Sequence, residues 1–217
     1  MTSKATPASR PPLTKDRILG AAVDLVDRSG LEALTMRRLG SELGFEAMSL
    51  YKHVANKDEI LDGMVELVVS RIEIPEEGSE WRNAMRRRAV SAREVLGRHS
   101  WAIGLLESRG FQGPAAMRYL DAILGNLTGS GFSIENAAHA FWLLDCYVYG
   151  QIVQETSIGS SDNDETTDAA PTLDLASEFP NLAAMYEHAA TFGYTFGDEF
   201  EFGLELILDG LDRYRDR

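Results

Sequence analysis

The side chains best suited to chemistry in this sequence are basic, hydroxyl and aromatic groups between residues 35 and 57, among them Arg37, Tyr51, Lys52 and Lys57. An arginine can form two hydrogen bonds to one guanine, a lysine suits a phosphate, and small apolar side chains can touch a thymine methyl group. The chemistry available to these residues is therefore contact with a polyanion, provided that a scaffold holds them outward.

No set of residues suggests catalysis or a metal site. The histidines His53, His99, His139 and His188 lack metal-ligand spacing, and the single cysteine, Cys146, has no paired base in sequence. The sequence also contains no phosphate-binding loop and no nucleophile elbow. We therefore expect that the protein is not an enzyme and that it uses no cofactor and no metal.

Charge divides the chain into a basic head and an acidic body. The 217 residues include 21 Lys and Arg against 34 Asp and Glu, yet residues 1–57 hold nine basic against six acidic residues. An acidic body repels phosphate, so a nucleic acid would contact the head alone. No stretch is long and apolar enough to span a membrane, and one cysteine fits a reducing cytoplasm. We expect a cytoplasmic protein with no membrane partner.

The apolar pattern predicts an all-α protein, because prolines are sparse and strand-type alternation is absent. A first helix is predicted from about Thr14 to Ser29, and a second from Thr35 to Gly44. A third begins near Glu46, and a fourth follows Asn56 and ends by residue 74. Further helices are predicted over residues 81–98, 100–108, 114–129, 134–156, 181–192 and 196–213, with a mobile loop at about 157–172.

Two short helices joined by a tight glycine-bearing turn, packed on a preceding helix, form a helix-turn-helix unit that can enter the DNA major groove. A plain three-helix bundle gives the same pattern. The residues in four segments distinguish a helix-turn-helix unit from a plain bundle. These segments are Gly30-Leu31-Glu32-Ala33-Leu34-Thr35-Met36-Arg37-Arg38-Leu39, Leu43-Gly44, Leu50-Tyr51-Lys52-His53-Val54 and Asn56-Lys57-Asp58-Glu59-Ile60-Leu61.

These segments closely resemble the N-terminal domain of the tetracycline-repressor-like (TetR) family. The body resembles the C-terminal domain of the same family, through Trp81, Gly113-Pro114, Gly131-Phe132-Ser133, Glu135-Asn136-Ala137 and Gly150. The resemblance implies a flexible arm over residues 1–13, a helix-turn-helix domain with its linker helix over 14–74, and a helical-bundle domain for effector binding and dimerisation over 75–217.

The resemblance also implies a homodimer that binds a palindromic double-stranded DNA operator and is released by a small-molecule effector of unknown identity. The positions that match DNA-contacting positions of the family are Thr35, Arg37, Ala47, Met48, Ser49, Tyr51, Lys52, His53 and Lys57.

Several of these residues have simpler structural explanations. Tyr51 is either a DNA contact or half in the core, Met48 either touches DNA or covers the turn, and His53 either binds phosphate or packs beside Val54. Arg38 is expected to be a surface charge. Ala47 and Met48 replace a polar residue and a proline of the tetracycline repressor, so its operator sequence does not transfer.

Comparison with the tetracycline repressor, position by position, also indicates that the effector is not tetracycline. Glu73, Arg88, Leu106 and Ile123 occupy four positions where the tetracycline repressor uses polar residues for its drug and magnesium. Leucine and isoleucine cannot replace an imidazole and an amide, so tetracycline is not expected to bind.

Arg88 shares the apolar face of its predicted helix with Trp81 and Met85, and an arginine there must be paired or reach water. We hypothesise that it binds an anionic or carbonyl group of the effector and is balanced by Glu73 or Asp145 when no effector is bound. The alternative is a permanent internal ion pair or a side chain whose charged end is solvated. The predicted effector-binding residues are Arg88, Trp101, Phe111, Met117, Trp142, Asp145, Cys146 and Tyr149.

Helices 134–156 and 196–213 resemble the pair that forms the dimer interface in this family. Their predicted interface residues are Phe141, Leu144, Val148, Leu204, Ile207, Leu208 and Leu211. The sequence thus predicts an effector-responsive transcriptional repressor. The alternative is a helical small-molecule-binding or carrier protein without DNA-binding activity.

Overall fold

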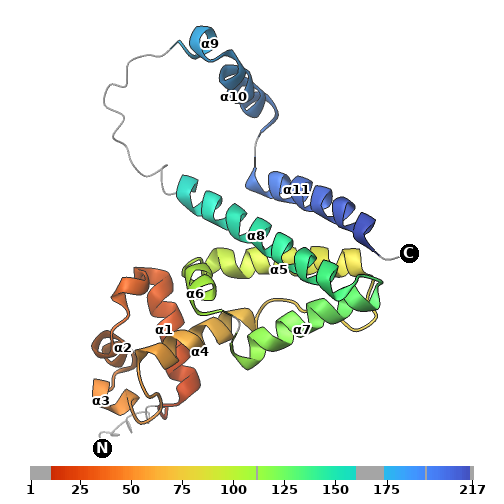
Figure 1. Ribbon diagram of the computed structural model, residues 1–217. Helices are drawn as coiled ribbons and strands as arrows, with labels where there is room; N and C mark the ends of the chain where they lie inside the picture. The colour runs from red at the N-terminus through yellow and green to blue at the C-terminus, as the bar shows by residue number, and fades with distance from the viewer. Residues whose placement is uncertain (1–10, 111, 160–173, 194, 216–217) are drawn as a thin grey trace, which may run out of the picture. The chain divides into compact units, whose positions relative to one another are not determined.

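The chain is helical throughout the part that its computed structural model describes, which is residues 11–110, 112–159, 174–193 and 195–215. In these residues the only extended pairing is one isolated bridge between Phe132 and Arg215, so the predicted all-α class is confirmed. Every helix in the same residues is too short or too polar to cross a bilayer. Figure 1 shows the α-helices, which are α1 (Lys15–Ser29), α2 (Met36–Leu43), α3 (Ala47–Leu50), α4 (Lys57–Val69), α5 (Trp81–Arg98), α6 (Trp101–Arg109), α7 (Pro114–Gly129), α8 (Ile134–Gly159), α9 (Leu175–Glu178), α10 (Pro180–Phe192) and α11 (Phe196–Leu211).

The predicted helix bounds agree closely with these. Helices α5 and α7 begin and end at the predicted residues. Helix α8 continues to Gly159, three residues past its predicted end, while the short α9 has no counterpart among the predicted helices. The remainder of the predicted mobile loop, from residue 160, lies outside the described residues.

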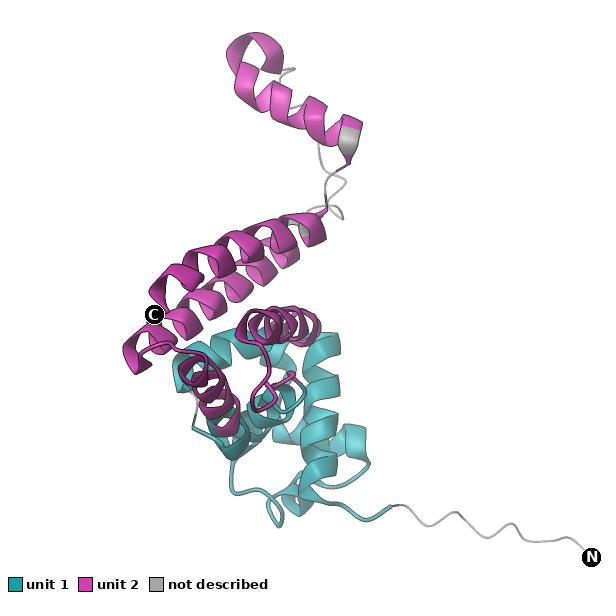
Figure 2. Ribbon diagram, turned by 90° about the vertical axis from the view of Figure 1, so that its right-hand side faces the viewer, with its two compact units in different colours: residues 1–71, 101–117 teal, residues 72–100, 118–217 magenta. Residues whose placement is uncertain are grey.

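The chain forms two compact units (Figure 2). Unit 1 comprises Met1–Arg71 and Trp101–Met117, and unit 2 comprises Ile72–Ser100 and Arg118–Arg217. The predicted boundary at residue 74 lies close to the junction at residues 71 and 72. The sequence does not indicate that α6 and the first turn of α7 belong to unit 1.

Unit 1 is built around the apolar face of α1. Ile18, Ala22 and Leu25 recur at helical spacing and are fully buried, where α1 packs on α2 and α4. The start of α1 is fixed by Thr14, whose hydroxyl accepts a hydrogen bond from the Arg17 amide at 3.3 Å. Helix α4 also packs on α6 within this unit. These contacts hold the two short helices α2 and α3 on a rigid base.

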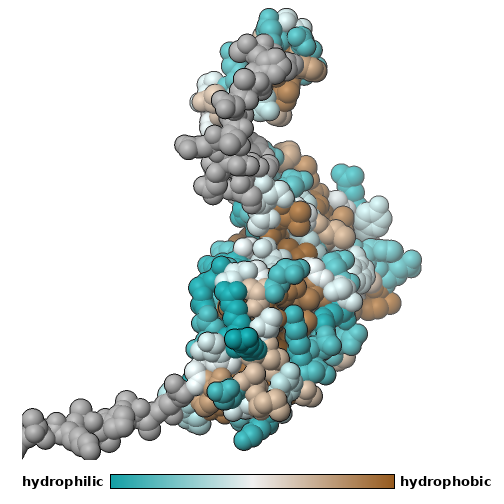
Figure 3. Space-filling view, turned by 90° about the vertical axis from the view of Figure 1, so that its left-hand side faces the viewer, coloured by the Kyte–Doolittle hydropathy of each residue, from teal (hydrophilic) through white to brown (hydrophobic). Residues whose placement is uncertain are grey.

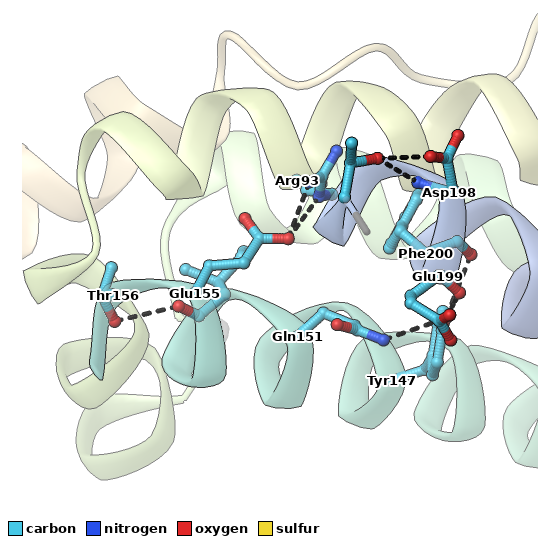
Figure 4. Close-up of polar contacts among 10 residues, drawn as sticks. Arg93, Tyr147, Gln151, Glu155, Thr156, Asp198, Glu199 and Phe200 are labelled. Atoms are coloured by element: carbon cyan, nitrogen blue, oxygen red, sulfur yellow. Dashed lines mark hydrogen bonds and ion pairs between the residues drawn. The ribbon is translucent and has the colours of Figure 1, made fainter. Parts of the chain in front are cut away.

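In unit 2, α8 packs on α5 and on α11. Figure 4 shows the polar links among these helices: Arg93 of α5 donates to Glu155 of α8 at 2.7 Å, and the Tyr147 hydroxyl donates to the Glu199 and Phe200 carbonyls of α11, each at 3.0 Å. The Arg93 guanidinium also lies 4.9 Å from the centre of the Phe200 ring. Polar contacts therefore fix how α11 lies on α8.

Most of the predicted dimer-interface residues lie inside the protomer. Phe141, Leu144, Val148, Leu204, Leu208 and Leu211 are buried within their own protomer, and Ile207 is half-buried. The large apolar residues exposed on α8 and α11 are instead Ile134, Trp142, Leu143, Val153, Phe202 and Leu206. The most apolar face of each helix packs inside the protomer, which leaves a second, mixed face available to a partner. Apolar side chains stand among hydrophilic ones on the molecular surface in Figure 3.

Candidate nucleic-acid interface and candidate effector site

A tight turn joins α2 to α3. Gly44 has a φ of 72°, in the left-handed region that glycine adopts readily, and the Phe45 amide donates to the Gly40 carbonyl at 2.9 Å. A Cβ atom on Gly40 would lie 2.8 Å from the Phe45 carbonyl oxygen, so only glycine fits this close approach. The Thr35 hydroxyl caps α2 by accepting from the Arg38 amide at 3.1 Å. The helix-turn-helix geometry follows from these local contacts.

Helix α3 and the turn after it are held by two buried side chains. Leu50 and Val54 are buried, whereas Met48 is 74% exposed. A Met48 that only covered the turn would be more enclosed than this. The predicted DNA-contacting residues that are exposed are Thr35, Arg37, Met48, Tyr51, Lys52, His53 and Lys57, and the half-buried ones are Ala47 and Ser49.

The cations of this surface are unpaired. Arg37, Lys52 and Lys57 make no ion pair with any described residue, so a phosphate need not displace a carboxylate to reach them. Arg38 differs, because it donates to the Ser29 hydroxyl at 2.8 Å across unit 1. Its expected role as a surface charge agrees with this contact.

The carboxylates beside Lys57 are occupied. Asp58 accepts from Arg109 at 2.6 Å. The Ala55 amide and the Lys15 ammonium both donate to Glu59 at 2.5 Å, and these bonds, that of Ala55 first, hold the pKa of Glu59 below its usual value. The start of α4 therefore presents Lys57 with its acidic neighbours turned to protein partners.

Arg88 forms the centre of a buried polar cluster in unit 2. Its side chain is fully enclosed, its Nε donates to the Tyr119 hydroxyl at 2.6 Å, and its Nη2 pairs with Asp145 Oδ1. The Tyr149 hydroxyl donates to the other oxygen of Asp145 at 3.3 Å. Of the two partners predicted for Arg88, the structure has Asp145, while Glu73 pairs with Arg87 at 2.8 Å.

One guanidinium nitrogen of the cluster is left without a partner. Arg88 Nη1 is buried and has no hydrogen-bond partner among the described residues. The guanidinium lies 5.1 Å from the Tyr119 ring centre and 5.5 Å from that of Phe141. Burial raises the pKa of Tyr119, so this phenol stays neutral and Asp145 balances the arginine. An enclosed donor without a partner is suited to an acceptor group of a ligand.

The other predicted effector residues are not gathered at this cluster. Trp101 belongs to unit 1, where its indole N–H donates to Asp27 at 2.7 Å. Met117, Trp142 and Cys146 are exposed. Phe111 lies outside the described residues.

Tyr119 is the member of the cluster that sequence reasoning missed. Ala116, Tyr119, Ile123 and Leu127 are all buried and recur along one face of α7. This periodicity is present in the sequence and could have placed the tyrosine inside. Its hydrogen bond to a residue on another helix has no sequence signal.

Comparison with known proteins agrees with this geometry. Residues 18–64 match the family described as bacterial regulatory proteins, tetR family, and residues 74–215 match the tetracyclin repressor-like C-terminal domain. The HTH-type transcriptional repressor DrrR1 of Streptomyces coeruleorubidus is 37% identical over 94% of this chain and 78% of its own length. The tetracycline repressor protein class C of Escherichia coli is 29% identical over 94% of this chain and 92% of its own length.

Solved structures are similar over the same extent. The crystal structure of the Streptomyces coelicolor TetR family protein ActR in complex with actinorhodin has a TM-score of 0.72 and 30% identity, covering 95% of this chain and 98% of that one. Relatives of this kind are regulators, which confirms the expectation that the chain is not an enzyme. The chain belongs to the TetR family and is a ligand-responsive, DNA-binding transcriptional repressor.

Proposed function

We propose that the protein acts in the cytoplasm as a homodimer, in which the two α3 helices enter successive major grooves of a palindromic operator. Two such helices must stand about 34 to 36 Å apart to do so. The observation that carries this proposal is the row of exposed, unpaired side chains on and around α3, with Arg37 offered to a base and Lys52 and Lys57 to phosphates.

Exposed stripes on α8 and α11 support the dimer. On α8, residues 139, 143, 146, 150 and 153 are exposed and follow one another by four and three positions, and on α11 Phe202 and Leu206 do the same. A hollow of about 390 Å³ on this surface is lined by Asn136, His139, Leu143, Leu211 and Tyr214. A side chain of the partner protomer would fill it in a four-helix interface.

The effector site of this proposal is the Arg88 cluster. Asp145 already neutralises Arg88, so a neutral ligand could use the unsatisfied Nη1 donor by presenting a carbonyl oxygen. An anionic ligand would have to displace Asp145 or leave a net negative charge in a buried site, which costs more. A carbonyl-bearing effector therefore fits the cluster better than a carboxylate or a phosphate. The actinorhodin complex of ActR supports a small-molecule effector for this chain as well.

Release from DNA would follow from a difference in effector affinity between two arrangements of the dimer. An effector that favours the arrangement with misplaced α3 helices by about 1 to 3 kcal/mol lowers operator affinity some 5- to 150-fold. In this proposal α4 tilts when the effector binds, because α4 follows α3 directly in the chain and packs on α1 and α6.

Selection of bound fragments from random duplex DNA tests the proposal, repeated with a panel of carbonyl-bearing and carboxylate-bearing compounds. The expected result is a palindrome that is lost from the selected pool with some carbonyl-bearing compounds. Operator affinity should fall steeply with salt. An Arg88→Met protein with unchanged effector sensitivity would rule out the site, and failure to bind any duplex would favour a carrier protein.

A further inference from the structure

Helix α7 belongs to both units. Its first turn, Pro114 to Met117, lies in unit 1, and the helix continues from Arg118 within unit 2. A continuous hydrogen-bonded helix transmits displacement along its axis, so α7 is a covalent link between the two units. Its side-chain contacts at each end determine what that link can carry.

The N-terminus of α7 is capped by a residue of α4. Glu66 accepts hydrogen bonds from the amides of Ala115 at 2.7 Å and Ala116 at 3.2 Å. These are two of the amides that a helix start leaves unsatisfied, and a residue just before the helix usually supplies the acceptor. Here that residue is Gly113, which has no side chain. The cap therefore comes from another helix, 49 residues away in the chain.

The space for this cap exists only because of Gly113. A Cβ atom at that position would collide with the Glu66 carboxylate. Pro114 completes the arrangement, since the first position of a helix needs no amide donor. The Gly113-Pro114 pair thus shapes the chain to receive a carboxylate from α4.

About one helical turn further along α7 is Tyr119, whose hydroxyl accepts from Arg88 at 2.6 Å. The same short stretch of helix therefore contacts the Arg88 cluster within unit 2 and α4 within unit 1. Helix α4 begins seven residues after the end of α3. A displacement of Arg88 can reach the recognition helix through two hydrogen-bonded contacts and two helices, α7 and α4.

We infer that the first two turns of α7 are the coupling element of this repressor, in which Tyr119 and Glu66 act as positioning residues between the Arg88 site and α4. The inference rests on the proposed function and adds the route of its regulation. When the effector binds at Arg88, the hydrogen bond from Arg88 to Tyr119 breaks and α7 shifts. Because Glu66 binds the first amides of α7, α4 shifts with it.

The test measures the distance between the two α3 helices of the full-length dimer without DNA or effector. A nitroxide is attached at Glu46→Cys, an exposed site before α3, in a Cys146→Ser background. Arg88→Met mimics loss of the site contact, and Tyr119→Phe removes only the hydroxyl. Each is expected to shift or broaden the distance distribution by roughly 1 to 2 Å, the scale of helix shifts in allosteric proteins.

Repeating the measurement in a Glu66→Ala background tests whether the shift passes through the Glu66 cap. The inference requires that Arg88→Met and Tyr119→Phe add no further shift when Glu66 is absent. A shift that persists undiminished in that background, or no shift from either variant, overturns it. Thr128→Val, which removes an exposed hydroxyl bonded only within α7 beyond the coupling stretch, is the matched control and should leave the distance unchanged.

Amide hydrogen exchange along α4 gives a second reading that needs no dimer. The same two variants should change exchange in α4 only while Glu66 is present, and a change independent of Glu66 contradicts the route. Failure of the proposed function appears separately, as a protein that selects no duplex. Neither measurement uses DNA, so the two failures are distinguishable.

Discussion

The guanidinium of Arg88 and the carboxylate of Asp145 pair inside unit 2, where both side chains are almost completely withdrawn from solvent. Replacing one partner leaves an uncompensated buried charge. We expect Asp145→Leu to lower the free energy of unfolding by about 3 to 5 kcal/mol, and the Arg88→Met, Asp145→Leu double variant to recover most of that loss.

Urea denaturation measures both changes. Glu73→Leu is the matched control, because Glu73 and its partner Arg87 each keep nearly half of the side chain exposed and such a pair contributes about 1 kcal/mol or less. If Asp145→Leu and the double variant lost the same free energy of unfolding, the uncompensated charge of Arg88 would not be the cause of the loss.

The DNA-contacting surface predicts two kinds of effect. Arg37→Ala should cost about 1 to 3 kcal/mol and relax specificity at one base pair, whereas Lys57→Ala should weaken binding to all sequences and reduce the salt slope by about one. Fluorescence anisotropy over a salt series on the selected operator separates the two. Arg38→Ala should change little, since that arginine is bonded to Ser29. A loss with Arg38→Ala as large as that with Arg37→Ala would place the base contact elsewhere.

The exposed face of α8 and α11 predicts how the dimer can be broken. Leu206 is 57% exposed in the protomer, and burial of a leucine contributes about 1.5 to 3 kcal/mol. Two copies are changed in a symmetric interface, so Leu206→Glu should weaken dimerisation at least about 100-fold. Sedimentation equilibrium reads the change directly. Ile74→Glu, an exposed apolar residue outside both helices, should remain dimeric, and a dimeric Leu206→Glu protein would exclude this face.

The cap on α7 predicts an unusual dependence between two substitutions. Gly113→Ala should expel the Glu66 carboxylate and cost about 0.5 to 2 kcal/mol, the range for loss of a helix cap. In a Glu66→Ala background the same substitution should cost much less. Thermal unfolding of the four proteins measures the interaction. Gly125→Ala, in open space later in α7, should be neutral or stabilising. Additive losses at residues 66 and 113 would contradict the geometry.

Local signals in the sequence predicted most of the fold. Thr14, Thr35 and Asn56 cap the helices that were predicted to begin beside them, because capping depends on residues only two or three positions apart. The four-residue α9 has too few residues to show a period. The packing of Trp101–Met117 with Met1–Arg71 in unit 1 is a tertiary arrangement that no local pattern encodes.

Some site residues could be predicted from the sequence and others could not, because a periodic pattern identifies an apolar face but not what packs against it. Periodicity shows that α8 has an apolar face, but it cannot tell whether that face meets the same protomer or a partner, so Phe141 and Leu144 were assigned to the wrong surface. Arg88 stood out because a charge on an apolar face demands a partner. Glu66 did not, since a glutamate on a helix surface looks ordinary until the amides it caps are found on α7.

Unit 1 is discontinuous, because the chain leaves it after Arg71 and returns between Trp101 and Met117. A fragment cut after α4 would lack the Trp101 indole that bonds Asp27 and the Arg109 fork that holds Asp58 and Asp62. Grafting the head of this protein onto the body of a relative therefore requires both segments to be transplanted together. Recombination at a single crossover would separate them, so new pairings of operator and effector in proteins of this architecture are more readily reached by point substitution than by exchange of halves.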